Sequence, residues 1–437
     1  MERWWITTSV AWWRRSTSSP RPQPDGPYPR VVRGGCGDRI QSSHPGMRSI
    51  SVDERRARLG LRHHLASEAG AKSFEQAAGS MVGLHASDPA SVYLAARARV
   101  REVSVDDIET ALYRDRSVIR ILGMRRTMFA APIELARLIQ AGAATRLVAG
   151  ERKRMAGYLA EGGITDEPET WLKEVEEATL EALLGMGSAF ARDLTKKVPA
   201  LAQQIRFGEG TKWAGSMGVS TRILFLLALD GRIGRGRPRG TWTSSQHQWG
   251  PIDDWSPGGL GGFEPEEARR QIVGRWLFTF GPGTMDDLRW WSGWTVAEVR
   301  NALEGLDVAE VDVGDRAALV LSNDIDPVLR PGSWVAFLPG LDPTPMGWKG
   351  RDWYLGPHKA ALFDTNGNIG PSIWHDGRII GGWGQDREKR VVYRLLEPVS
   401  GRVTKAVARE AGRVEEWIGD TKVTPRFRTP LEAELGR

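Results

Sequence analysis

The chain has 437 residues, of which 41% are hydrophobic and 26% charged, as in an ordinary globular protein of more than one domain. The formal charge is +6, but residues 1–46 hold seven arginines against three acidic residues. The remainder is close to neutral, so total charge alone does not indicate a nucleic-acid partner. The single cysteine, Cys36, excludes an internal disulfide and a cysteine-based zinc site.

Residues 1–46 carry tryptophan pairs, scattered arginines and a proline-rich stretch without a periodic apolar face, so we expect a disordered extension. We expect residues 1–46 to be an upstream extension and Met47 to be the better candidate for the true start, because a capping box from Ser51 to Glu54 follows it. The sequence shows neither a secretory signal nor an apolar run of about 18 residues, which predicts a cytoplasmic protein with no membrane partner.

From Met47 onward, a group of helices followed by a β-hairpin recurs three times, which is typical of winged-helix domains. In the first group, helices are expected at about 52–68, 74–84, 89–99 and 104–114, before paired strands within 118–129 and a long helix over 132–160. In the second group, helices are expected at 168–184, 188–197 and 219–229, with strands around 232–234 and 241–243. In the third group, helices are expected at 264–279, 284–292 and 295–305, with a hairpin of 308–313 and 317–321.

After Pro331 the sequence changes to short β runs with hairpin signals at Asn366-Gly367 and Asp376-Gly377. We expect a small antiparallel β-barrel or sheet over about residues 332–398, then a helix over about 400–417 and a frayed tail. The predicted fold class is α+β, with three tandem winged-helix domains, a β-barrel and a C-terminal helix. The predicted domain boundaries are 1–46, 47–165, 166–256, 257–328, 329–399 and 400–437.

The segment GLHASDP, residues 83–89, places His85 and Ser87 at the break between two helices. Asp88 and Pro89 are typical of an N-cap and a first helical residue. His85 and Ser87 would therefore lie near a helix N-terminus, whose dipole favours negative charge. Two simpler interpretations stay open, since Ser87 could only cap the helix and His85 could only fill a corner.

Basic residues on two hairpins are candidates for contacts with DNA phosphates. The stronger candidates are the wing arginines, interleaved with glycines that allow close approach: Arg232, Arg235, Arg237 and Arg239. Arg125 and Arg126 on the first hairpin are weaker candidates, and a solvated loop is the alternative for both hairpins. The 219–229 helix is apolar on all sides, which favours a core position and counts against a sequence-specific repressor. Helical spacing also favours core packing over base stacking for Trp290, Trp291 and Trp294.

The sequence contains no phosphate-binding G-x-x-x-x-G-K-[ST] loop, no G-x-G-x-x-G after a strand and no H-E-x-x-H. We therefore expect neither a nucleotide cofactor nor a catalytic metal.

These segments together resemble the winged-helix DNA glycosylases of bacteria, the family typified by AlkZ and YcaQ. The resemblance covers about residues 47–417 and rests on GLHASDP (83–89), MRRT (124–127), the hairpin after Gly231, FTFGPGT (278–284) and LPGLDP (338–343). It implies three winged helices and a β-barrel in a C-shaped clamp that excises alkylated bases without a metal. The family's catalytic Gln-x-Gln or Gln-x-Asp motif matches positions 85–87, where this chain has His85 and Ser87. Phe129 likewise stands where the family pattern has a histidine.

Glycosidic hydrolysis passes through an oxocarbenium-like state and needs a positioned water. An N-alkylated purine is already cationic and leaves as a neutral base, so a water-holding pair suffices. His85, with an ordinary pKa near 6.5, would accept a proton from that water and Ser87 would orient it. The sequence thus predicts a monomeric, monofunctional glycosylase acting on double-stranded DNA. The alternatives are a non-catalytic binder of damaged DNA and a dimeric transcriptional regulator.

Overall fold

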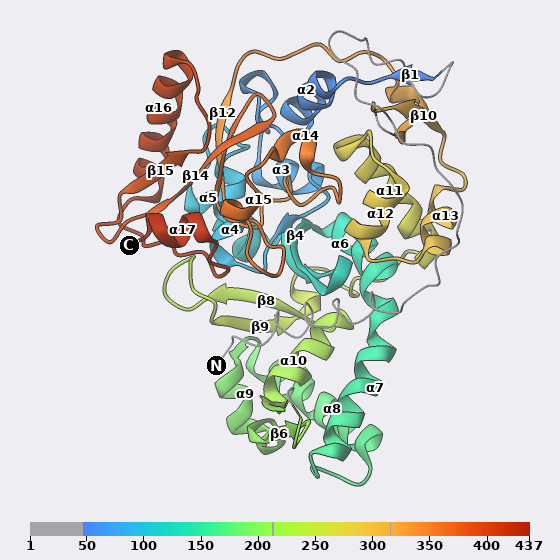
Figure 1. Cartoon of the computed structure of the whole chain (residues 1–437). Helices are drawn as coiled ribbons and strands as arrows, with labels where there is room; N and C mark the ends of the chain where they lie inside the picture. The colour runs from blue at the N-terminus through green and yellow to red at the C-terminus, as the bar shows by residue number, and fades with distance from the viewer. Residues whose placement is uncertain (1–46, 212–213, 315) are drawn as a thin grey trace.

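The computed structural model describes residues 47–211, 214–314 and 316–437; the expected disorder of residues 1–46 falls outside this range. Most of the buried apolar side chains belong to one continuous core. In Figure 1 the second helical group forms the lower part of the molecule, and the other two groups lie together with the C-terminal sheet above it.

The first helical group begins with two helices, each of which has a serine as its N-cap. Ser51 and Ser73 accept hydrogen bonds from the backbone N–H of Glu54 and Gln76, respectively. The elements are β1 (Arg48–Ser49), α2 (Val52–Arg62), α3 (Phe74–Ser80), β2 (Leu84–His85), α4 (Pro89–Arg97), α5 (Val105–Glu109), β3 (Val118–Leu122), β4 (Met128–Pro132), α6 (Ile133–Ile139) and α7 (Thr145–Glu161). The long helix predicted over 132–160 is interrupted by a π-helical turn, Gln140–Ala144, which side-chain periodicity does not reveal.

The second group differs from expectation at its hairpin. Its elements are α8 (Pro168–Met186), β5 (Ala189–Phe190), α9 (Ala191–Lys197), β6 (Gln204–Phe207), β7 (Gly215–Gly218), α10 (Val219–Leu229), β8 (Ile233–Pro238) and β9 (His247–Pro251). The strand predicted at 241–243 was wrong, because those residues form the turn that leads into β9. Helix α10 is largely buried, as its apolar sequence predicted.

The third group matches expectation closely, with α11 (Pro265–Phe280), α12 (Met285–Ser292), α13 (Val296–Leu303), β10 (Val308–Asp312) and β11 (Ala317–Leu321). Two of these helices begin with a capping box, at Thr284 with Asp287 and at Thr295 with Glu298.

Three three-stranded sheets accompany these groups, in the orders β2-β4-β3, β5-β9-β8 and β1-β10-β11. In each of the first two sheets, a two-residue strand between helices pairs with the second strand of a hairpin. In the third sheet, β1 pairs in parallel with β10, while Gly283, between α11 and α12, forms a bridge with Leu319.

The C-terminal region forms an open sheet, so the predicted closed barrel was wrong. Its elements are β12 (Val335–Leu338), α14 (Asp352–Leu355), α15 (Lys359–Leu362), β13 (Ser372–His375), β14 (Arg378–Gln385), β15 (Val391–Leu395), α16 (Gly401–Ile418) and α17 (Pro430–Leu435). The strand order is β12-β13-β14-β15, and the two edge strands pack against α16 (Figure 1). The prediction of a frayed tail was also wrong, because α17 packs on β14 and buries Leu431.

Candidate active site and nucleic-acid interface

His85 and Ser87 lie where strand β2 ends and helix α4 begins. His85 is opposite Phe129 of β4, and the backbone N–H of Ala86 donates to the carbonyl of Met128 at 2.8 Å. The strand ends there because Asp88 caps α4, accepting a hydrogen bond from the N–H of Ala90 at 3.2 Å. The sequence correctly predicted this cap, and the fold brings His85 and Ser87 to the N-terminus of α4.

His85 is a partly exposed residue, and the centroid of its ring lies 5.1 Å from that of Phe129. Its Nδ1 is buried and has no hydrogen-bond partner among the described residues. Burial lowers the pKa of His85 to about 4; the positive charge of Arg125 also lowers it, and the carboxylate of Asp342 opposes the shift. The expected ordinary pKa was therefore wrong, and His85 is neutral at physiological pH.

Ser87 and Asp88 have different surroundings. The Ser87 hydroxyl accepts a long hydrogen bond from the N–H of Met128, at 3.4 Å. The Asp88 carboxylate is buried, and it accepts from the N–H of Ala90 through one oxygen and of Arg426 through the other. Burial raises the pKa of Asp88. Both of its oxygens accept backbone hydrogen bonds, so Asp88 has a structural role, while His85 and Ser87 stay the candidate site residues.

Arg125 and Arg126 occupy the turn between β3 and β4, and both have a left-handed backbone, with φ of 55° and 59°. Non-glycine residues rarely adopt this conformation, and strain of this kind is frequent at functional sites. Arg126 forms an ion pair with the buried Glu151 at 2.6 Å. Arg125 instead lies over the ring of Trp290, so the two neighbours have different electrostatic environments.

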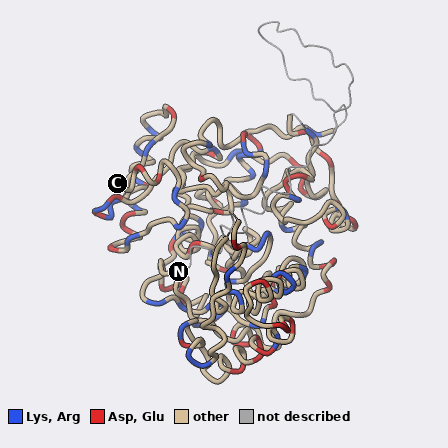
Figure 2. Tube along the Cα trace, turned by 60° about the horizontal axis from the view of Figure 1, so that its bottom comes forward, with Lys and Arg blue, Asp and Glu red and all other residues tan. Residues whose placement is uncertain are grey.

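The wing arginines lie on β8 and beside it. Arg232 and Arg239 are exposed, Arg235 lies 5.4 Å from the ring centroid of Trp249, and Arg237 forms an ion pair with Glu109 of α5. The hairpin packs beside β3, which places it next to the sheet that carries His85. Basic and acidic residues are interspersed over the face shown in Figure 2.

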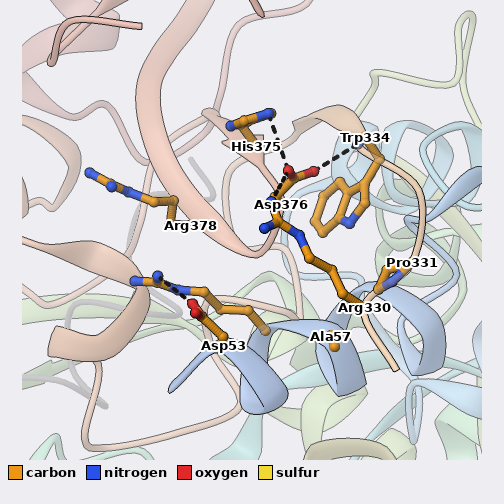
Figure 3. Close-up of a pocket in the computed structure, with 9 residues that line it drawn as sticks. Asp53, Ala57, Arg330, Pro331, Trp334, His375, Asp376 and Arg378 are labelled. Atoms are coloured by element: carbon orange, nitrogen blue, oxygen red, sulfur yellow. Dashed lines mark hydrogen bonds and ion pairs between the residues drawn. The ribbon is translucent and has the colours of Figure 1, made fainter. Parts of the chain in front are cut away.

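A separate cavity of about 240 Å³ lies between α2 and the β13–β14 hairpin (Figure 3). Its lining includes Arg330, whose guanidinium pairs with Asp376 at 2.7 Å, and the other oxygen of Asp376 accepts from the N–H of Trp334. The hairpin packs tightly on α2, since a Cβ on Gly377 would lie 2.5 Å from Cβ of Arg56. The arginines that line the cavity have carboxylate neighbours. The geometry therefore favours a place where the hairpin packs on the helix over a ligand-binding site.

The LPGLDP segment supplies an ion pair that sequence reasoning missed. The side chains of Asp342 and Arg99 are both 0% exposed, and the guanidinium donates to the carboxylate at 2.6 and 2.8 Å. A charged residue inside an otherwise apolar segment was the available signal. The same carboxylate acts on the pKa of His85, which links this pair to the candidate site.

The described residues contain no group of three or more His, Cys, Asp or Glu side chains placed to hold a metal ion. Among the same residues, no helix is both long enough and apolar enough to cross a membrane.

A family model described as DNA glycosylase AlkZ-like matches residues 78–417. The chain therefore belongs to the AlkZ-like family of DNA glycosylases, which are DNA repair proteins, and the resemblance of the sequence motifs is confirmed. The chain is 27% identical over 244 residues to an interstrand DNA cross-link repair glycosylase of Streptomyces sahachiroi, covering 53% of this chain and 61% of that relative. It thus spans about three fifths of that relative's length.

The solved structure of the Streptomyces sahachiroi DNA glycosylase AlkZ matches with a TM-score of 0.66 and 20% identity, covering 86% of this chain and 98% of the other. At this identity the match shows a shared mixed α/β fold.

Proposed function

We propose that this protein is a metal-free, monofunctional glycosylase that releases alkylated bases from double-stranded DNA. The observation that carries the proposal is the placement of His85, neutral and partly exposed, beside Ser87 at the N-terminus of α4. Two further points support the proposal: the chain belongs to the family, and residues 83–89 resemble the segment that carries the family's catalytic motif.

In the proposed reaction, water attacks C1′ of the sugar as the glycosidic bond breaks and its electron pair leaves with the base. A cationic alkylated purine becomes neutral in this step. A pKa of about 4 makes His85 a weak base, so its main role is to accept a hydrogen bond from the water and fix its position. The proton passes to solvent after the new C–O bond forms, and Ser87 orients the same water.

We further propose that residues 47–165, 166–256 and 257–328 are three winged-helix units, followed by a sheet domain (329–399) and a C-terminal helix and tail (400–437). Support comes from the three similar sheets, each of which joins a hairpin to a strand or bridge next to a helix. We propose that the protein is a cytoplasmic monomer that binds duplex DNA through its hairpins.

The direct test is base release from a duplex carrying N7-alkylated guanine, corrected for release without protein. We expect a rate constant that stays nearly constant from pH 8 to 5.5, because His85 gains a proton only near pH 4. A histidine of ordinary pKa would already be about 90% protonated at pH 5.5. A rate that falls tenfold between pH 7 and 5.5 would contradict the assigned protonation state.

The second candidate is a non-catalytic binder of damaged DNA, which the absence of both family side chains at positions 85 and 87 favours. Binding to alkylated duplex without base release at any pH between about 6 and 9 would establish it. A transcriptional regulator would instead form a two-fold dimer, which the mass in gel filtration would reveal.

Replacing the four wing arginines by alanine should weaken binding to all duplex sequences and flatten its salt dependence. Removing one arginine–phosphate interaction should reduce the slope of log K against log salt by roughly 0.9 on B-form DNA. The matched control replaces four exposed cations of α16, Arg402, Lys405, Arg409 and Arg413, and should keep the slope. Equal slopes for both variants would show that the wing does not bind phosphates.

A further inference from the structure

Two guanidinium groups from distant segments lie on one indole ring. The guanidinium carbons of Arg125 and Arg351 are each 4.6 Å from the ring centroid of Trp290. Trp290 is partly exposed, whereas its neighbours Trp291 and Trp294 are only 8% and 4% exposed. The expected core position therefore holds for Trp291 and Trp294, whereas Trp290 lies under two cations. We call Arg125 and Arg351 the arginine pair.

The arginine pair concentrates positive charge at one place on the protein. Within residues 47–211, 214–314 and 316–437, neither Arg125 nor Arg351 forms an ion pair with a carboxylate. Arg351 donates to the carbonyl of Trp348 at 3.0 Å, and this acceptor carries no formal charge. Arg125 is exposed to solvent, yet partial enclosure by protein and the nearby charge of Arg351 lower its pKa to about 10. Two like charges held together in this way favour an anion between them.

The segment that carries Arg351 is held in place without a bound ligand. Asp287 of α12 is buried, and one of its oxygens accepts from the backbone N–H of Lys349 at 2.8 Å and of Gly350 at 3.0 Å. These bonds hold the segment next to Trp290, which lies on α12 like Asp287.

The position of Arg125 is fixed as well, because helix α12 packs against the β3–β4 turn. Gly293, the C-cap of α12, makes room for the side chain, since a Cβ there would lie 2.9 Å from Cγ of Arg125. A prearranged pair of this kind needs little reorganisation to bind.

The arginine pair lies beside the candidate active site. The turn with Arg125 leads directly into β4, whose Met128 binds the backbone of Ala86 and the hydroxyl of Ser87. Arg125 and the His85–Ser87 segment therefore sit at the same end of one sheet.

We propose that Arg125 and Arg351, supported by Trp290, bind one backbone phosphate of the DNA next to the nucleotide that reaches His85. The position of that nucleotide rests on the proposed function. A phosphate offers several oxygens that two guanidinium groups bind through charge-assisted hydrogen bonds. Its negative charge also offsets the positive charge that would otherwise repel a cationic alkylated base at His85.

The test measures binding to a duplex with a tetrahydrofuran abasic site, which cannot lose a base, with single phosphates replaced in turn by uncharged methylphosphonate. Wild-type protein should lose about tenfold in affinity at one position near the abasic site and little elsewhere. Arg125→Gln and Arg351→Gln should each lose about tenfold on native DNA and become insensitive at that position. Arg351→Lys should recover part of the affinity.

The control is Arg394→Gln on β15, whose arginine is paired with Glu434 at 2.7 Å and which should bind like wild type. Melting temperatures check that the variants fold. If Arg125→Gln and Arg351→Gln bind native DNA normally, or stay as sensitive as wild type at every phosphate, the proposal is overturned. Because no base is released in this assay, an inactive protein that shows the expected pattern would contradict the proposed function and support the phosphate site.

Discussion

His85→Ala should remove most base release, with a loss of about 10² to 10⁴ in rate, while DNA affinity stays close to that of wild type. The alanine cannot hold the attacking water, an interaction that matters in the transition state, whereas the phosphate contacts remain. Single-turnover rates on alkylated duplex and binding to uncleavable duplex measure the two effects separately.

Two further variants sharpen this prediction. His85→Gln should keep measurable activity, because an amide oxygen can hold the same water and the family uses glutamine there. Ser87→Ala should lose less than His85→Ala, since solvent partly replaces a hydroxyl that only orients water. Wild-type rates in His85→Ala would show that the ring merely packs against Phe129.

Asp342→Ala should destabilise the fold by about 3–5 kcal/mol, because it leaves the guanidinium of Arg99 buried without its counter-charge. The carboxylate also accepts from the backbone N–H of Thr344 at 2.9 Å, so a second buried donor loses its partner. Denaturant unfolding of wild type and variant measures the change in the free energy of unfolding.

The control for this prediction is Glu434→Ala, which breaks the exposed pair with Arg394 and should change stability by less than about 1 kcal/mol. Replacing Arg99 and Asp342 together by apolar residues should recover much of the stability, since no buried charge then remains. Similar effects of Asp342→Ala and Glu434→Ala would contradict the role assigned to the buried pair.

The parts of this fold that sequence predicted well depend on local signals. The helix starts at Ser51 and Asp88 follow from side chains that bind the next turn of backbone, and the Asp376-Gly377 turn joins β13 to β14. The family followed from short motifs, of which residues 83–89 contain the candidate active site.

The parts that sequence did not predict depend on contacts between distant segments. The pKa of His85 reflects burial and the charges of Arg125 and Asp342, which only the folded chain brings near it. The pairing of Arg125 with Arg351 on Trp290 joins three separate segments. The C-terminal strands form an open sheet. Whether such strands close into a barrel depends on pairing between the edge strands, which turn signals do not encode.

The contact between Asp88 and Arg426 has a consequence for biosynthesis. The carboxylate accepts from the backbone N–H of Arg426 at 3.0 Å, and the Arg426 guanidinium donates to the carbonyl of Ser87 at 3.5 Å. A growing polypeptide emerges from the ribosome N-terminus first, so the segment around His85 waits for these bonds until more than 330 further residues have been translated. A protein truncated by a stop codon shortly before Arg426 would keep the hairpins. Its candidate catalytic segment would lack the hydrogen bonds from Arg426 to Asp88 and Ser87.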